Sequence, residues 1–152
     1  MSCLRLAILL GASVAISPLA MDAYLPAFPD IAAAFGVPVH RVGLTLGVFL
    51  LGLSVGHLVG GPLSDAYGRD RVMLFGVALF GVGSLLSAIS PGFNALMAFR
   101  LVQAICAGAC VVSVPAIARD HTSGSDAASL FSLIGLVIFI APAVAPTLGT
   151  LL

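Results

Sequence analysis

Formal charge is missing from two long stretches of this chain. No Asp, Glu, Lys or Arg occurs in residues 42–64 or in residues 72–99. A helix rises about 1.5 Å per residue, so about 20 apolar residues cross the hydrocarbon core of a bilayer. The first stretch fits one such helix. The second is too long for one, and Ser90-Pro91-Gly92 predicts a turn inside it.

The composition agrees with a membrane protein. Hydrophobic residues make up 61% of the 152 residues and charged residues only 8%, whereas a soluble domain has about 25% charged residues. We therefore expect an all-α membrane protein with five transmembrane helices, at about residues 6–25, 42–64, 72–89, 95–118 and 127–152. The net charge of zero gives no indication of a nucleic-acid partner.

The amino-terminal segment has two interpretations. Arg5 precedes an apolar run, as in a signal peptide. Four further spans, and a segment 22–29 that looks like a structured helix end, favour a first transmembrane helix instead. Pro18 is expected to bend this helix, and Pro26 and Pro29 are expected to end it. Residues 30–41 would then form the first external loop.

Arginine placement predicts the orientation. Four arginines fall on one side of the predicted spans and only Arg41 on the other: the four are Arg5, Arg69, Arg71 and Arg119. The side with four is expected to be cytoplasmic, which puts the amino terminus inside. Residues 119–126 would form a polar internal loop.

Two ionisable residues, Asp22 and Arg100, are predicted to lie within the membrane. A charge there is energetically costly, so we treat both as candidate functional residues. Asp22 is about 6 Å from one end of its span and Arg100 about 7–8 Å from the same face, at about 1.5 Å per residue. They could form a neutralising pair, or each side chain could extend separately to the interface.

Small residues predict close helix packing. Gly52, Gly56 and Gly60 recur every four residues, which lets another helix backbone approach. His57, one residue off this stripe, is interpreted as a polar packing residue rather than a proton carrier. Cys106 and Cys110 share a helical face and are expected to pack. The sequence shows no metal-ligand cluster and no Ser/His/Asp set, so we do not expect an enzyme.

The segment between the second and third predicted spans is the densest cluster of charge. Pro62 and Gly68 are expected to break the helices there. Asp65 could cap or face a helix N-terminus, and Arg69 and Arg71 are expected to stay in water. The segment could be a solvated turn that only fixes topology. Its pattern G-x-L-[AS]-D-x-x-G-R-x-R, however, resembles the loop signature of the major facilitator superfamily, with Ala66 and Asp70 where that family usually has basic residues.

Three further motifs extend the resemblance. Asp22-x-Tyr24-Leu25-Pro26-Ala27-x-Pro29 resembles the first-helix signature of drug:proton antiporters of the bicyclomycin/chloramphenicol-resistance (Bcr/CflA) subfamily. Arg100-x-x-Gln103-Ala104 resembles the fourth-helix signature, and Ala141-Pro142-x-x-Ala145-Pro146-x-x-Gly149 resembles the antiporter signature of the fifth helix. The family has twelve helices in two halves, so the resemblance implies that this chain is an incomplete N-terminal half.

The resemblance also implies a function. It is the proton-coupled efflux of drug-like small molecules across the bacterial inner membrane, with the proton as coupling ion and no other cofactor. The implied roles are as follows: Asp22, Arg100 and Gln103 in proton coupling or the substrate cavity; Gly61, Asp65, Gly68, Arg69 and Arg71 in a cytoplasmic gate loop; Pro142, Pro146 and Gly149 in shaping the fifth helix. The implied partners are a drug substrate, the lipid bilayer and the missing C-terminal helices.

A different class of function stays open. The chain could be a truncated, non-transporting membrane protein that packs with other membrane chains. Whether it is a fragment or a true truncated product is also left open by the sequence.

Overall fold

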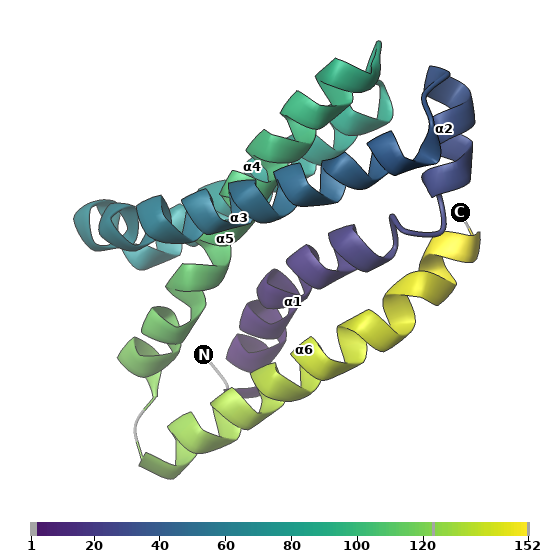
Figure 1. The fold of residues 1–152 in the computed structure, drawn as a ribbon. Helices are drawn as coiled ribbons and strands as arrows, with labels where there is room; N and C mark the ends of the chain where they lie inside the picture. The colour runs from purple at the N-terminus through teal and green to yellow at the C-terminus, as the bar shows by residue number, and fades with distance from the viewer. Residues whose placement is uncertain (1–2, 123, 152) are drawn as a thin grey trace.

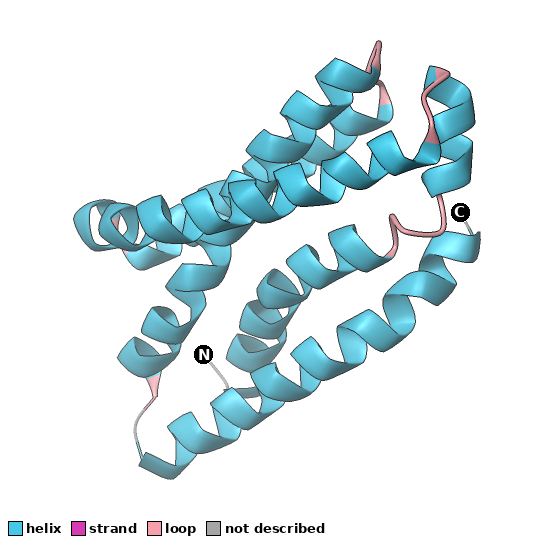
Figure 2. Ribbon diagram, viewed as in Figure 1, coloured by secondary structure: helices cyan, strands magenta, loops and turns pink. Residues whose placement is uncertain are grey.

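The computed structural model describes residues 3–122 and 124–151; side-chain surroundings are described for residues 5–122, 124 and 127–145. Within these ranges the chain forms α1 (Cys3–Asp22), α2 (Phe28–Phe35), α3 (Val39–Tyr67), α4 (Arg69–Ala88), α5 (Phe93–His121) and α6 (Gly124–Leu151). Figure 2 shows helices joined by short loops. All of these helices except α2 are long and apolar enough to cross a membrane. The expected all-α class with five candidate spans is confirmed.

The end of the first span differs from the prediction. Helix α1 ends at Asp22 rather than near Leu25, because the residue before a proline, here Leu25, is disfavoured in the helical conformation. The segment expected to be an external loop contains the short helix α2. Pro29 lies in the first turn of α2 and so begins a helix rather than ending one. Proline is tolerated there because its missing N–H would have no partner anyway.

The charged segment also differs from the prediction. Pro62 lies inside α3, which continues to Tyr67, and Gly68 alone separates α3 from α4. Gly68 has φ 95° and ψ 134°, a conformation that residues with a side chain rarely adopt. At the other connection, α5 runs past the expected end near Ala118 to His121. The residues expected to begin a loop therefore form the last turn of a helix.

The helices form two groups that share α5. Helix α5 packs along both α3 and α4, and α1 packs along α6 (Figure 1). The C-terminal half of α5 joins the groups through an apolar cluster with α1 and α6. Its largest fully buried side chains are Leu10 of α1, Val114 of α5 and Leu130 of α6. This junction lies at the end of the molecule that carries Arg5 and Arg119.

The glycine stripe of α3 packs against α5, as predicted. Gly52, Gly56 and Gly60 are all buried. A Cβ atom at Gly52 would lie 2.7 Å from the carbonyl oxygen of Leu101, and one at Gly56 would overlap the carbonyl group of Ile105. The prediction for His57 is wrong: its side chain is exposed, because one residue turns a helix by about 100° away from the packed stripe.

Candidate functional site

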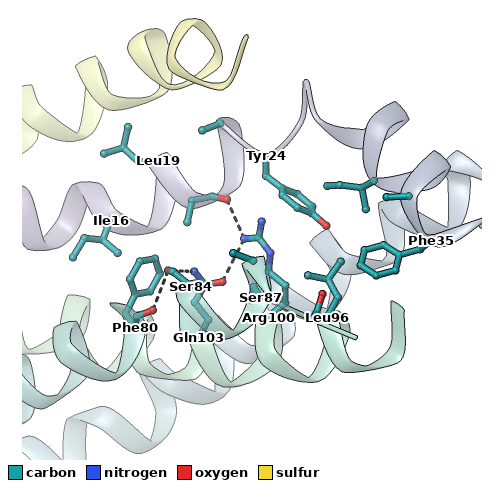
Figure 3. Close-up of a pocket in the computed structure, with 16 residues that line it drawn as sticks. Ile16, Leu19, Tyr24, Phe35, Phe80, Ser84, Ser87, Leu96, Arg100 and Gln103 are labelled. Carbon is teal, nitrogen blue, oxygen red and sulfur yellow. Dashed lines mark hydrogen bonds between the residues drawn. The ribbon is translucent and has the colours of Figure 1, made fainter. Parts of the chain in front are cut away.

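A buried arginine connects three helices near the end of α1. Arg100 of α5 is 8% exposed. Its Nη1 donates to the carbonyl oxygen of Ala20 at 3.1 Å and to Oε1 of Gln103 at 3.4 Å. Gln103 Nε2 then donates to Oγ of Ser84 on α4 at 2.6 Å. Figure 3 shows this chain of hydrogen bonds. It ties the last turn of α1 to α5 and α4.

An aromatic ring covers the guanidinium. The central carbon of the Arg100 guanidinium lies 3.7 Å from the centroid of the Tyr24 ring, and 5.7 Å from that of Phe49. Tyr24 is itself held by an edge-on contact with Phe28, with ring centroids 5.4 Å apart, and its Oη accepts a hydrogen bond from Thr45 at 3.4 Å. A cation over an aromatic face contributes about 1–2 kcal/mol, according to how far it is desolvated. The ring therefore helps to stabilise the buried charge.

The expected ion pair between Asp22 and Arg100 is not formed. Helices α1 and α5 do meet at this depth, because Arg100 reaches Ala20. Asp22 is the half-buried last residue of α1 and makes no ion pair in the part of the chain that the structure describes. The alternative, in which the side chain extends separately to the membrane interface, also fails for Arg100, because Arg100 is buried between helices. Around the guanidinium the structure places the Ala20 carbonyl and the Tyr24 ring instead of the Asp22 carboxylate.

An open cavity of about 740 Å³ lies beside this cluster. Residues of α1, α2, α4 and α5 line it, including Ser84, Arg100 and Gln103, together with Tyr24 of the α1–α2 connection. Of the three residues predicted for proton coupling or the cavity, the structure brings Arg100 and Gln103 together on this wall. Asp22 does not line it. Nε of Arg100 is buried without a hydrogen-bond partner, so its guanidinium is only partly satisfied.

A second polar contact joins the α3–α4 connection to the end of α5. Arg69 Nη1 donates to both carboxylate oxygens of Asp120, each at 2.6 Å. Arg69 Nη2 lies 3.5 Å from Oδ1 of Asp65. Asp65 makes no cap hydrogen bond at the start of α4, so the first of its two expected roles, capping, is not seen. Arg69 stays partly exposed to water, as expected, and is also paired with both acids. Both acids keep half or more of their side-chain surface exposed.

Several residues of these contacts are not among the predicted site residues, most notably Tyr24 and Asp120. In the sequence Tyr24 stands out only as part of a motif. The sequence predicts Asp120 in a loop, but it lies in the last turn of α5. An acid is unfavourable there without a nearby cation, because the helix dipole is negative at that end. An acid at that position therefore indicates a cationic partner, which here is Arg69.

The remaining predicted residues lie apart from both contacts. Gly61 is surrounded by open space, and Arg71 is exposed on α4. Pro142 is exposed, and α6 continues through it. Pro146 and Gly149 lie outside the residues whose surroundings the structure describes. No group of three or more His, Cys, Asp or Glu residues within the described ranges is placed to hold a metal ion.

Comparison with known proteins connects this arrangement to a family. Residues 10–152 match the family described as Major Facilitator Superfamily. An uncharacterized MFS-type transporter, YdgK, of Bacillus subtilis is 41% identical over 146 residues, which cover 96% of this chain and 36% of the relative. A chloramphenicol resistance protein of Pseudomonas aeruginosa is 36% identical over 137 residues, covering 90% and 33%.

A third relative, a bicyclomycin resistance protein homolog of Haemophilus influenzae, is 36% identical over 143 residues, covering 92% of this chain and 35% of its own. The chain thus spans about a third of the length of these relatives. Their names confirm the resemblance to the bicyclomycin and chloramphenicol resistance proteins. With apolar helices of membrane-spanning length and a match over nearly all its residues, this chain is a multi-pass membrane protein and belongs to the major facilitator superfamily.

Proposed function

We propose that this chain forms part of an exporter that moves drug-like small molecules out of the cell, driven by protons. The resistance named in two of its relatives supports a drug-like substrate. We place the protein in the bacterial inner membrane with its amino terminus in the cytoplasm, because four arginines lie on that side. The activity breaks no covalent bond of the substrate, so we assign no catalysis.

The observation that carries the proposal is the contrast along the contact between α1 and α5. At one end the helices are joined by an apolar core. At the other end Arg100 donates a hydrogen bond to the Ala20 carbonyl of α1, and Tyr24, just after α1, covers its guanidinium beside an open cavity. A carrier that alternates between two open states needs one contact that persists and another that can be exchanged. The polar end supplies the exchangeable contact.

In this proposal Asp22 is the residue that takes up and releases the proton. It terminates the helix whose last turn Arg100 holds. Arg100 then acts on Asp22 through the backbone of α1 and not by a direct ion pair. The arginine-to-aspartate contact of Arg69 and Asp120 holds the opposite membrane face closed in one of the two states.

The test is proton-driven export by the complete encoded protein in everted membrane vesicles. Asp22→Asn should reduce export to background while the protein remains in the membrane. Asp30→Asn is the matched control, because Asp30 is an exposed acid in the first turn of α2. Export by the Asp22→Asn protein with an unchanged pH dependence would contradict the coupling role. Export by neither the wild type nor the control would instead favour the non-transporting alternative.

A further inference from the structure

A second cavity, of about 520 Å³, lies between α3 and α4. We call it the α3–α4 groove. Its walls include Val59, Leu63 and Tyr67 of α3, and Arg71, Phe75 and Leu79 of α4. Apart from Arg71 and the hydroxyl of Tyr67, these side chains are apolar. Most of them are open to the surroundings: Tyr67 is 67% exposed and Phe75 is 65% exposed.

The groove exists because α3 and α4 both pack closely on α5 and only sparsely on each other. Gly56 of α3 lies against the backbone of Ile105. Gly76 of α4 lies against Cys106, where an added Cβ would come 3.0 Å from the carbonyl oxygen. Contacts between α3 and α4 themselves are few compared with those that each makes with α5. The small residues of α5 between them, such as Cys106 and Ala109, form the floor of the groove.

One end of the groove is cationic. Arg71 is exposed and makes no ion pair or hydrogen bond within the described part of the chain. It lies in the first turn of α4, beside Tyr67 at the end of α3. A cation and a tyrosine at the end of membrane spans are placed at the depth of lipid headgroups, where cations attract anionic lipids.

The length of the groove agrees with one lipid leaflet. Arg71 and Leu79 are eight residues apart on α4, which is about 12 Å along the helix axis. Half of the hydrocarbon core of a bilayer is about 15 Å. An acyl chain whose headgroup phosphate lies at Arg71 would therefore extend along the apolar walls as far as the region of Leu79.

We propose that the α3–α4 groove binds an anionic phospholipid, with its phosphate on Arg71 and one acyl chain between α3 and α4. This site is separate from the cavity beside Arg100. It depends only on the protein lying in a membrane, so it does not rest on the proposed export function. The apolar walls would contribute affinity for any lipid, and Arg71 would contribute the preference for negative charge.

The test uses quenching of a single tryptophan by brominated lipid. These 152 residues contain no tryptophan, so Phe75→Trp, in a background where any tryptophan outside them is replaced by phenylalanine, places the one indole in the groove. Leu74→Trp is the matched control: Leu74 is 68% exposed on the same helix at the same depth, but does not line the groove. Each variant is reconstituted in vesicles of phosphatidylcholine with increasing fractions of brominated phosphatidylglycerol, or of brominated phosphatidylcholine.

We expect phosphatidylglycerol to be preferred over phosphatidylcholine about fivefold at Phe75→Trp, and about equally at Leu74→Trp. Adding Arg71→Gln should remove the preference, Arg71→Lys should retain most of it, and Arg119→Gln, which removes an exposed arginine outside the groove, should leave it unchanged.

Three results would overturn the proposal. An equal preference for phosphatidylglycerol at the two tryptophan positions would mean that the groove contacts bulk lipid without selecting any. Weak quenching by both lipids at Phe75→Trp would mean that another protein segment or a second copy covers the groove. A preference that survives in the Arg71→Gln protein would assign the selectivity to other charges. If the Arg71→Gln protein does not insert into the membrane, the comparison of the two lipids at Phe75→Trp and Leu74→Trp still shows whether the groove selects the anionic lipid.

Discussion

The two ends of the contact between α1 and α5 differ in chemistry: one is apolar and the other is polar. At one end Leu10, Val114 and Leu130 are at most 1% exposed and fill the space between three helices. At the other end a guanidinium, a carbonyl oxygen and a phenol ring meet beside a cavity of about 740 Å³. Packed apolar side chains have one good arrangement. Polar partners can be exchanged for others of similar strength, so the second end is the one suited to movement.

The largest loss of stability is expected at the apolar end. Leu10→Ala would leave a cavity between α1, α5 and α6, and should lower the free energy of unfolding by about 2 kcal/mol or more, since packing rather than hydrophobic transfer holds helices in a membrane. Unfolding in detergent, followed by circular dichroism, measures this change. Leu9→Ala is the control, because Leu9 is 54% exposed. Equal losses in the two variants would mean that the apolar end is no better packed than the surface of α1.

A smaller loss of stability is expected at Arg100. Arg100→Gln removes the donor to Ala20 and the cation over Tyr24, and should cost about 1–2 kcal/mol because the carbonyl loses a charged partner. Arg100→Lys should recover part of this loss, since lysine keeps the charge without the planar fork. Unfolding in detergent, followed by circular dichroism, measures these losses as well. A loss at Arg100 that exceeds the loss at Leu10 would reverse the proposed assignment of the two ends.

The contribution of the aromatic ring can be separated from its volume. Tyr24→Leu removes the π face and should cost about 1 kcal/mol, whereas Tyr24→Phe keeps the face and should cost less. The double variant with Arg100→Gln should show that the two losses are not additive. Additive losses would show that the ring and the guanidinium stabilise the fold independently, despite their 3.7 Å separation.

The smallest effect on stability is expected at Arg69 and Asp120. Both side chains are substantially exposed, and exposed ion pairs contribute little and are screened by salt. Arg69→Gln and Asp120→Asn should each change stability less than Tyr24→Leu, with a coupling that disappears at high salt. A double-mutant cycle at two salt concentrations measures it. Coupling that persists in high salt would indicate a pair shielded from water.

The sequence predicts the features that depend only on residues close together in the chain. Apolar runs between charges locate five helices, and a glycine every four residues on α3 predicts the close contact with α5, because both depend on spacing along one segment. Contacts between distant segments are harder to predict. Asp22 and Arg100 are predicted at one depth, and Arg100 does reach Ala20 in the last turn of α1. Depth does not give the direction of a side chain, however, and the ring of Tyr24 lies over the guanidinium instead.

Proline was misread for a related reason. The same residue ends one helix or begins the next according to which side of it the helix lies on, as Pro29 in α2 shows. Pro62 shows a third case, since a proline within a long helix can be accommodated when the flanking turns remain packed on a neighbour. The partnership of Arg69 with Asp120 spans 51 residues, and no local pattern contains it.

The single residue between α3 and α4 limits how these helices can move. Adjacent Cα atoms are about 3.8 Å apart, so a connection consisting of Gly68 alone leaves almost no slack. Neither helix can slide along its axis past the other by even one helical turn of about 5.4 Å without unwinding. Any rearrangement of the pair therefore has to be a rotation about Gly68, close to the place where Arg69 meets Asp120.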